Sequence, residues 1–438
     1  MPDFESRAED WLPFAEALER VLSRLSPLPP ETVPLEAALG RALTRDVLAP
    51  TQLPPWDNSA MDGYAVRGED VAGATKDQPV VLAVTGVIHA GTRFEGTVGP
   101  GEAVRIMTGA EIPGGADTVI RVEDTDREET EVGNLRIYSE RDRGRHVRPA
   151  GQDWSEGAVT LTSGTSIGPG QIAVLAATRI SKVPVHGRPT VAILASGDEL
   201  VDLDCPSLDR HQIPESYSYF AAAGVLAAGG TPMRLGIARD DRDDIQDHLA
   251  RAADADVLVT LGGASMGERD LFKTVLKELG LDLEFWRVKI RPGSPVSFGY
   301  LPREGQSNQA VFGLPGNPYS AFVTFELFVR PFLLGLAGHA RLRRPTISAL
   351  AAEDLTTAED LTGFLRVCLS GSGAGLEASL TGSQGSGLVG SLGAADGLAI
   401  IPEGVKAIPR GDPVAVMLLD DPRGTLSTPP DSSPRTAG

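Results

Sequence analysis

The sequence predicts a multidomain α/β plus β protein, in which a doubly wound and mostly parallel sheet domain is joined to all-β domains. Strand and helix patterns alternate between residues 185 and 338. Short β-branched runs separated by Gly and Asp or Glu turns fill residues 75–140, and β patterns return after residue 339. A chain of 438 residues has room for about two to four domains at roughly 100–200 residues each.

Each predicted parallel strand is a continuous apolar run: VAILA at 191–195, VLVTL at 257–261 and AVFGL at 310–314. Helical patterns at 219–230, at 243–252 and from Asn317 onward separate or follow these runs. Continuous apolar strands that alternate with helices are typical of a parallel sheet covered on both faces.

The other boundaries follow from composition and periodicity. Apolar residues at helical spacing predict a helix over residues 13–25, and the Pro-, Ser- and Thr-rich end of the chain predicts disorder. The predicted parts are a helical linker domain over 1–50 and 150–184, an inserted β domain over 51–149, the α/β domain over 185–338, a small C-terminal β-barrel over 339–422 and a disordered tail over 423–438.

The composition argues against several classes of protein. A net charge of −19 does not suit a general nucleic-acid binder, which needs a basic face. The acidic N-terminus lacks the form of a signal peptide, and no apolar run approaches the roughly 18 residues of a membrane helix. Cys205 and Cys368 have no metal-ligand spacing. The simplest expectation is a reduced, cytoplasmic protein that binds neither nucleic acid nor membrane.

Polar loops follow all three apolar strands: SGDEL at 196–200, GGASMGERD at 262–270 and PGNPYS at 315–320. Ligands bind outside the carboxyl ends of such strands, so loops at one edge predict a pocket. The glycines of GGASMG expose N–H groups, Ser265 adds a hydroxyl, and the following helix adds its positive dipole end. This favours recognition of a phosphate or a pterin, although a tight strand-to-helix turn has the same composition.

Carboxylates gather at the same predicted edge, at Glu199, Asp240, Asp241 and Asp270. They would repel a phosphate unless a cation lay between, and Mg²⁺ held by one or two carboxylates and ligand phosphates is the usual solution. Each could instead satisfy N–H groups at the start of a helix, and Asp270 is the most open to that alternative.

Positive charge is concentrated in two places. Arg287, Lys289 and Arg291 alternate along a predicted strand, which would place them on one face. They could form a solvated sheet edge, but in so acidic a chain we favour a clamp for an anion. The tract RDRGRHVRP at 141–149 is interpreted as a basic surface loop in preference to a ligand contact.

One further stretch, PPWDNSAMDGY at 54–64, places Asp57 and Asp62 in a segment with neither helical nor strand periodicity. Alone, it is typical of a surface turn. Together with the loops above, it resembles the MoeA family of molybdopterin molybdenumtransferases, which includes the gephyrin E domain. The matching segments are DNSAMDGYAVR (57–67), RIMTGA (105–110), RPAGQD (148–153), SGDEL (196–200), GGASMGERD (262–270), KIRPGSP (289–295) and GLPGNPYS (313–320).

The resemblance covers residues from about 10 to 420. It implies a MogA-like sheet domain within an elongated homodimer of four-domain subunits, whose active cleft also uses another domain, often of the partner. It further implies insertion of molybdate into adenylylated molybdopterin, with Mg²⁺-assisted cleavage of the adenylate and release of AMP and molybdenum cofactor. Proteins that synthesise molybdopterin, or adenylylate it as MogA does, are the candidate partners.

The resemblance and the loops together give a set of expected site residues. The expected catalytic residues are Asp62, Thr108, Asp153, Glu199, Asp240 and Asp270, of which Glu199, Asp240 and Asp270 are also the expected metal ligands. The residues expected to bind cofactor are Ser196, Gly197, Gly262, Gly263, Ser265, Arg287, Arg291, Pro315, Gly316, Asn317 and Pro318.

The chain departs from the family pattern at several positions. The family often has Lys where this chain has Arg287, Arg291 and Ser294, and the family stretch GQIYDSN is HQIPESY at 211–217, with Glu215 and Tyr217 replacing Asp and Asn. Molybdate and nucleotide contacts could therefore differ. Two alternatives stay open: a non-catalytic dimeric scaffold like the gephyrin E domain, and a paralogue with another ligand, such as a tungsten-specific enzyme or a nucleotide pyrophosphatase.

Overall fold

The computed structural model describes residues 11–126, 133–262, 271–305, 307–371 and 375–419. The chain forms two compact units. Unit 1 comprises residues 1–44, 164–168 and 182–438, and unit 2 comprises residues 45–163 and 169–181. This division is coarser than the predicted domain boundaries, which stay predictions.

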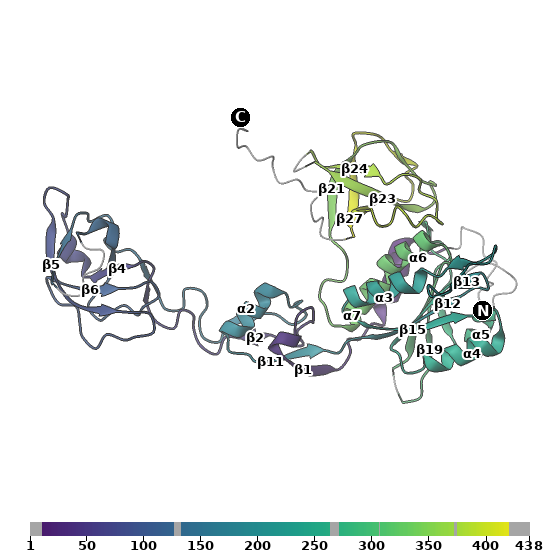
Figure 1. The fold of residues 1–438 in the computed structure, drawn as a ribbon, viewed down its shortest axis with the longest axis horizontal. Helices are drawn as coiled ribbons and strands as arrows, with labels where there is room; N and C mark the ends of the chain where they lie inside the picture. Colours follow the sequence, from purple (N-terminus) through teal and green to yellow (C-terminus); the bar gives the residue numbers. More distant parts are fainter. Residues whose placement is uncertain (1–10, 127–132, 263–270, 306, 372–374, 420–438) are drawn as a thin grey trace. The chain divides into compact units, whose positions relative to one another are not determined.

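A six-stranded sheet forms the centre of unit 1 (Figure 1). Its strands, in spatial order, are β15 (Thr231–Ala238), β12 (Thr190–Ser196), β16 (Val257–Leu261), β20 (Gln309–Leu314), β19 (Ser297–Leu301) and β17 (Asp282–Phe285). The first four are parallel, and the last two add antiparallel pairs. Ala195 pairs with Leu261, and Leu261 with Leu314, so the three predicted apolar strands end level with one another. The predicted mostly parallel sheet is confirmed.

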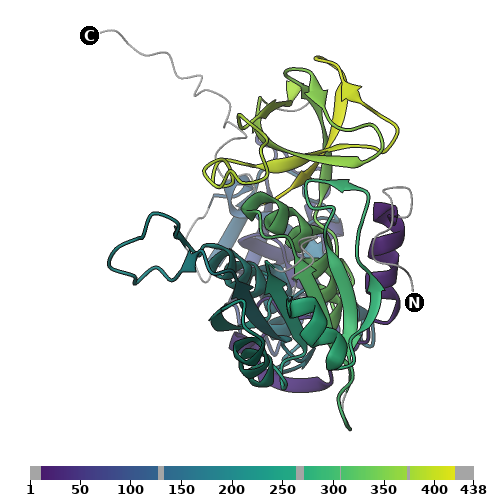
Figure 2. The same cartoon turned by 90° about the vertical axis from the view of Figure 1, so that its right-hand side faces the viewer.

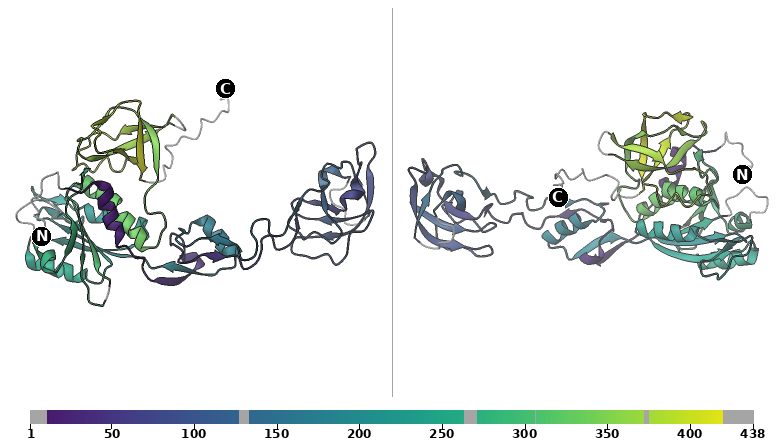
Figure 3. Two further views of the ribbon diagram at one scale, coloured as in Figure 1. Left: turned by 180° about the vertical axis from the view of Figure 1, so that it is seen from behind. Right: turned by 45° about the horizontal axis from the view of Figure 1, so that its top comes forward.

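Helices cover both faces of this sheet, because alternate strand residues enter different cores. Val191, Ile193 and Ala195 of β12 belong to one apolar core, and Ala192 and Leu194 to another. The first core takes in α1 (Phe14–Ser23), α3 (Tyr217–Ala227), α6 (Pro318–Thr324), a π-helical segment η5 (Phe325–Val329) and α7 (Arg330–Leu336). The second takes in α4 (Arg242–Arg251) and α5 (Leu271–Glu278). Figure 3 shows α1 beside the α6–α7 helices. This is the predicted doubly wound arrangement.

The C-terminal strands of unit 1 close into a small barrel (Figure 2). The ring runs β23 (Thr362–Ser370), β24 (Glu377–Leu380), β21 (Thr346–Ala351), β27 (Pro413–Leu418) and β25 (Gly397–Ile401), and β25 pairs again with β23. A short strand from the α/β domain, β18 (Ile290–Arg291), joins β23. The predicted C-terminal barrel is therefore confirmed, and its own core lies inside the ring.

Short elements complete unit 1. They are β1 (Pro30–Pro34) with β11 (Lys182–His186), β13 (Leu200–Val201) with β14 (Ile213–Pro214), β22 (Leu355–Thr356) with β26 (Ala407–Ile408), and a 3₁₀ turn over Leu35–Ala37. The segment Pro318–Leu336 is long and apolar enough to cross a membrane, but 89% of it is buried. It is a core helix of this unit.

Unit 2 contains a five-stranded sheet in the order β7 (Thr118–Arg121), β4 (Gly63–Val66), β6 (Glu102–Ile106), β5 (Val80–Ile88) and β8 (Gly133–Ile137). The other elements are β2 (Val47–Leu48) with β10 (Val159–Leu161), β3 (Asn58–Ser59) with β9 (Val147–Arg148), the helix α2 (Pro169–Ala177), and 3₁₀ turns over Gly68–Val71 and Val122–Asp124. The β character predicted for residues 75–140 is confirmed in the described part of that range.

A buried histidine joins two segments of unit 1 that are far apart in sequence. His339 follows α7, and its Nδ1 lies 2.6 Å from the hydroxyl of Ser166. Burial, aided by the charges of Arg330, Arg41 and His186, lowers the pKa of His339 below its ordinary 6.5. The unfolded chain therefore takes up this proton more readily than the folded chain.

Acid should destabilise unit 1 through His339. The pKa of His339 is lower in the folded chain than in the unfolded chain. The contribution of the neutral imidazole to the free energy of unfolding is therefore complete above pH 6.5 and is lost as the pH falls through the lowered pKa. Between about pH 7.5 and about pH 5.5, we expect the Tm of His339→Gln to fall less than that of the wild type, by calorimetry. The exposed His211→Gln should behave as the wild type; equal falls for all three proteins would contradict this prediction.

Candidate active site

The backbones at the ends of β12 and β16 approach one another too closely for a side chain at Gly262, and the loop after β20 lies beside them. A Cβ at Gly262 would lie 2.6 Å from the carbonyl oxygen of Ser196, and Gly262 has a φ of +92°. A Cβ at Gly316 would lie 3.6 Å from the Cα of Gly262. Glycine satisfies both conditions without strain. The structure thus brings together Ser196, Gly262 and Gly316 as predicted, while Gly263, Ser265 and Asp270 lie outside the described residues.

Carboxylates stand beside this strand end. The Asp240 N–H donates to Oδ1 of Asp198 at 3.3 Å, and a Cβ on Gly197 would lie 2.7 Å from Oε2 of Glu199. Burial, together with the charges of Asp198 and Glu199, raises the pKa of Asp240. The predicted pair Glu199 and Asp240 is therefore close together, and Asp198 joins it. Asp241 instead caps α4, where it accepts from the N–H groups of Asp243 and Asp244.

These carboxylates fit a magnesium ion by their donor chemistry. Oxygen ligands from one or two carboxylates, completed by substrate phosphates, are the usual protein contribution to Mg²⁺ binding. Across the described ranges no group of three His, Cys, Asp or Glu side chains forms a complete metal site. The third predicted ligand, Asp270, lies outside those ranges, so the three-residue metal site stays a prediction.

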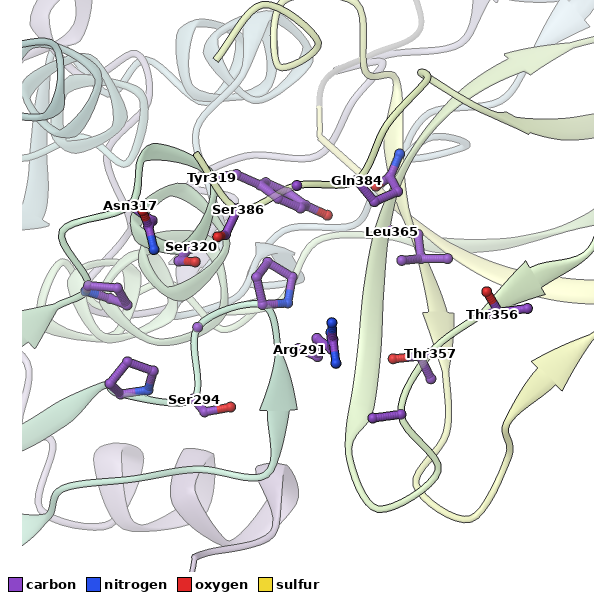
Figure 4. A pocket seen from close by; sticks show the side chains of 16 residues that line it. Arg291, Ser294, Asn317, Tyr319, Ser320, Thr356, Thr357, Leu365, Gln384 and Ser386 are labelled. Carbon is purple, nitrogen blue, oxygen red and sulfur yellow. The ribbon is translucent and has the colours of Figure 1, made fainter. Parts of the chain in front are cut away.

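A pocket of about 800 Å³ opens between the α6 end of the sheet domain and the barrel. Its polar lining comes from Arg291, Ser294, Asn317, Tyr319, Ser320, Thr356, Thr357, Gln384 and Ser386 (Figure 4). None of the described residues that line it is a carboxylate. Hydroxyl, amide and guanidinium donors in this arrangement favour an anion.

One loop belongs both to the strand end and to the pocket. Gly316 lies against Gly262, while its neighbours Pro315 and Asn317 line the pocket. Pro318 then begins α6 at a position where its missing N–H costs nothing. A ligand that extends from the glycine turns into the pocket would contact PGNPYS along its length.

In unit 2, the structure brings together three of the stretches that the sequence singled out. Asp62 accepts hydrogen bonds from the Thr108 N–H at 2.7 Å and from its hydroxyl at 2.9 Å. These bonds, the backbone one first, lower the pKa of Asp62. The Ala150 N–H donates to Oδ1 of Asp57 at 2.7 Å, which ties the DNSAMDGY loop to the stretch that carries Asp153. Asp153 itself is exposed.

Comparison with known proteins agrees with this arrangement. Residues 12–178 match the MoeA N-terminal region (domain I and II), 192–335 a probable molybdopterin binding domain, and 348–419 the MoeA C-terminal region (domain IV). A molybdopterin molybdenumtransferase from Bacillus subtilis is 34% identical, over 94% of this chain and 95% of its own. The chain belongs to the MoeA family. It is a molybdopterin molybdenumtransferase of molybdenum cofactor biosynthesis, as the sequence predicted.

Further relatives show the same extent of similarity. The molybdopterin molybdenumtransferase of Nostoc sp. is 36% identical over 89% of this chain and 88% of its own. Two crystal structures from Pyrococcus horikoshii, both titled molybdopterin biosynthesis moeA protein, align with TM-scores of 0.79 and 0.74 at 29% and 34% identity. They cover 93% and 94% of this chain and all of the matched chains. The multidomain MoeA fold is thereby shown.

The predicted common face of three cations is wrong in this MoeA-family enzyme. Residues 286–289 lie between the strands β17 and β18, and Val288 forms only an isolated bridge with Leu12: the Leu12 N–H donates to the Arg287 carbonyl, and the Lys289 N–H donates to the Leu12 carbonyl. Arg287 stacks on Trp11 at 5.0 Å, and Lys289 pairs with Glu403 at 3.2 Å. Only Arg291 of the three lines the pocket.

Two departures from the family pattern have local explanations. Glu215 of HQIPESY is buried, and its carboxylate accepts from the Ser218 N–H at 2.7 Å and from the Ser218 hydroxyl at 2.5 Å, at the start of α3. This carboxylate is therefore engaged by the helix. The Ser294 hydroxyl donates to the Ile290 carbonyl at 2.5 Å, so the residue in place of a lysine closes its own turn.

Part of the basic tract at 141–149 is paired within unit 2. Arg141 makes two hydrogen bonds to Asp124, at 2.6 and 2.9 Å. Asp142 is buried; burial opposes its ionisation, but hydrogen bonds from Arg121 and His146 outweigh that and lower its pKa to about 2. This supports the interpretation of the tract as a structural surface loop.

Sequence reasoning missed the barrel's contribution to the pocket. Thr356 ends the short strand β22, Thr357 follows it, and Gln384 and Ser386 lie between β24 and β25; none of the four belongs to a motif identified in the sequence. The Gly- and Ser-rich stretch TGSQGSG at 381–387 was the available signal. Such turns expose backbone N–H groups, as the GGASMG loop does.

Alanine at Gly262 should damage the site more than alanine at Gly236. Both glycines have positive φ, which costs a non-glycine residue roughly 1–3 kcal/mol. Only a Cβ at Gly262 also collides with the Ser196 carbonyl, because a Cβ at Gly236 meets no atom within 4 Å. We expect Gly262→Ala to lose most turnover and to have a lower Tm than Gly236→Ala. Equal activity in the two variants would show that close approach at the strand end is not required.

Removing the Thr108 hydroxyl should raise the pKa of Asp62 toward its ordinary 3.8. In Thr108→Val the backbone hydrogen bond remains, so the pKa should stay partly lowered. An NMR titration of the labelled Asp62 carboxyl carbon would measure the change. Thr160→Val, which removes a hydroxyl that bonds to the Val47 carbonyl in the same unit, should leave the titration unaltered. An unchanged Asp62 curve in Thr108→Val would contradict the assignment.

Proposed function

We propose that this enzyme inserts molybdate into the dithiolene of adenylylated molybdopterin, with cleavage of the adenylate and release of AMP and molybdenum cofactor. The observation that carries the proposal is the PGNPYS loop. Gly316 lies close enough to Gly262 that a Cβ on it would be 3.6 Å from the Gly262 Cα, and Asn317 and Ser320 line a pocket free of described carboxylates. A phosphorylated pterin and an oxyanion would thus be held by the two sides of one loop.

At the strand end, backbone N–H groups of the glycine turns bind the terminal phosphate of the pterin. Glu199 and Asp240 would hold Mg²⁺, with Asp270 as the proposed third ligand. The ion, when bound, supplies positive charge to the phosphates that the carboxylates would otherwise repel. The burial and mutual repulsion that raise the pKa of Asp240 are the conditions that a bound cation relieves.

In the pocket, Arg291 attracts molybdate and offsets negative charge as the phosphoanhydride breaks. The sequence analysis predicted the same role for Arg287. Because the Arg287 guanidinium stacks on Trp11, we assign Arg287 instead to stabilising the segment that leads to Arg291. We propose no covalent enzyme nucleophile: an oxygen of molybdate attacks the adenylate phosphorus, the phosphoanhydride bond breaks with the pterin phosphate as leaving group, and AMP departs with that oxygen as the dithiolene sulfurs replace it on molybdenum.

Asp62, Thr108 and Asp153 are proposed as the catalytic group of unit 2. Two hydrogen bonds from Thr108 keep Asp62 ionised, so at neutral pH it accepts hydrogen bonds or cations and does not donate a proton. The homodimer, the cytoplasmic location and partners that supply adenylylated molybdopterin are likewise proposals, drawn from the family.

Incubation with adenylylated molybdopterin, Mg²⁺ and molybdate tests the proposed reaction, with AMP and active cofactor as the products assayed. A non-catalytic scaffold would release neither product. A tungsten-specific enzyme would respond better to tungstate than to molybdate, and a nucleotide pyrophosphatase would release AMP without any oxyanion.

Loss of either key carboxylate should abolish turnover without unfolding the chain. We expect Asp62→Ala and Glu199→Ala each to stop AMP release while the Tm stays within about 4 °C of the wild type, because changing an exposed polar residue costs little stability. The exposed residues Asp77 and Asp204 lie in the same two units, and Asp77→Ala and Asp204→Ala should retain activity. Near-normal turnover in both key variants would refute these roles.

A further inference from the structure

Tyr319 connects the sheet domain to the barrel at the edge of the pocket. Its side chain is fully buried, and its hydroxyl donates to the Phe364 carbonyl on β23. Its backbone N–H donates to the Ser386 carbonyl at 3.1 Å. Burial raises the pKa of Tyr319 well above its ordinary 10, so the phenol is protonated and can donate at neutral pH. One residue of α6 therefore holds two separate segments of the barrel.

Arg366 extends this connection into the pocket wall. Its guanidinium is fully buried, with Cζ 3.7 Å from the centre of the Tyr319 ring. It donates to the carbonyls of Leu388 at 2.7 Å and Ser383 at 2.9 Å, and its backbone N–H donates to the Gln384 side chain at 2.8 Å. The loop 383–388 is thus folded around a cation that itself rests on the tyrosine ring.

The two walls of the pocket meet at this stack. Asn317 and Ser320 of the α6 segment and Gln384 and Ser386 of the loop 383–388 all line the pocket, and Figure 4 shows Ser386 beside Ser320 and Gln384 on the other side of Tyr319. A movement of the tyrosine relative to β23 would change the separation of these polar groups. Hydrogen-bond donors bind an anion well only when they are held within a fraction of an ångström of the productive geometry. The stack of Arg366 on Tyr319 therefore controls the preorganisation of the pocket.

We propose that Tyr319 is a positioning residue for the reaction, which sets the loop 383–388 against α6 and so fixes the geometry of the oxyanion pocket. The residue need not touch the substrate. Its loss weakens molybdate binding and leaves the chemical step unchanged. This inference rests on the proposed function only in taking molybdate as the occupant of the pocket.

The full-length Tyr319→Phe enzyme tests the proposal, because phenylalanine keeps the ring under Arg366 and removes only the hydroxyl. We expect faster amide hydrogen exchange in peptides that contain residues 383–388. We also expect an apparent KM for molybdate about three to ten times higher, with kcat within about twofold, as the loss of one buried hydrogen bond suggests. The exchange experiment needs no substrate.

Tyr300→Phe is the matched control. Tyr300 is also buried in the core of the sheet domain, and within the described structure its hydroxyl has no hydrogen-bond partner. This variant should change neither the exchange of 383–388 nor the KM. Arg366→Lys keeps the positive charge but loses the fork that binds the loop carbonyls, so it should accelerate exchange in the same peptides.

Three results would decide the matter. Unchanged exchange of 383–388 in Tyr319→Phe, or a lowered Tm with an unchanged KM, would overturn the positioning role. A wild-type enzyme that does not use molybdate would overturn the proposed function, and the exchange comparison would still show whether Tyr319 positions the loop.

Discussion

The closeness of three backbone segments at one sheet edge is the constraint on which the site depends. Because β12, β16 and β20 end level, the residues that follow them are forced together, and only glycine leaves enough room at Gly262. Beside this edge, the Asp240 N–H donates to Asp198 of SGDEL, while residues of PGNPYS line the pocket next to the barrel. The acidic residues and the carboxylate-free pocket lining thus follow different strands of the same sheet edge.

Electrostatics explains why these groups are segregated. In a chain of net charge −19, an anion needs a local surface free of carboxylates. The pocket between α6 and the barrel offers such a surface, because none of its described lining residues is an Asp or a Glu. At the strand end, burial and the neighbouring charges of Asp198 and Glu199 raise the pKa of Asp240, so a cation there would be favourable. The proposed cation and the proposed oxyanion would therefore occupy separate places.

The elements that the sequence predicts well are those whose signal is local. VAILA, VLVTL and AVFGL are buried on both faces, so each is a continuous apolar run, and the parallel sheet follows from them. The common face predicted for Arg287, Lys289 and Arg291 was wrong because the backbone of this segment makes hydrogen bonds with Leu12. That residue is distant in the sequence, so no local pattern reveals the pairing. The stack of Arg366 on Tyr319 likewise joins residues from separate domains, and neither residue alone marks a site.

The closed ring of the barrel bears on how such an enzyme could change its ligand. Each of its strands β21, β23, β24, β25 and β27 has a neighbour on either side, so the turns that connect them can vary in length and composition without exposing an unpaired strand edge. Thr357 and Gln384 reach the pocket from such turns. Selection for a different oxyanion could therefore act on the C-terminal turns while the phosphate-binding edge of the sheet is inherited intact.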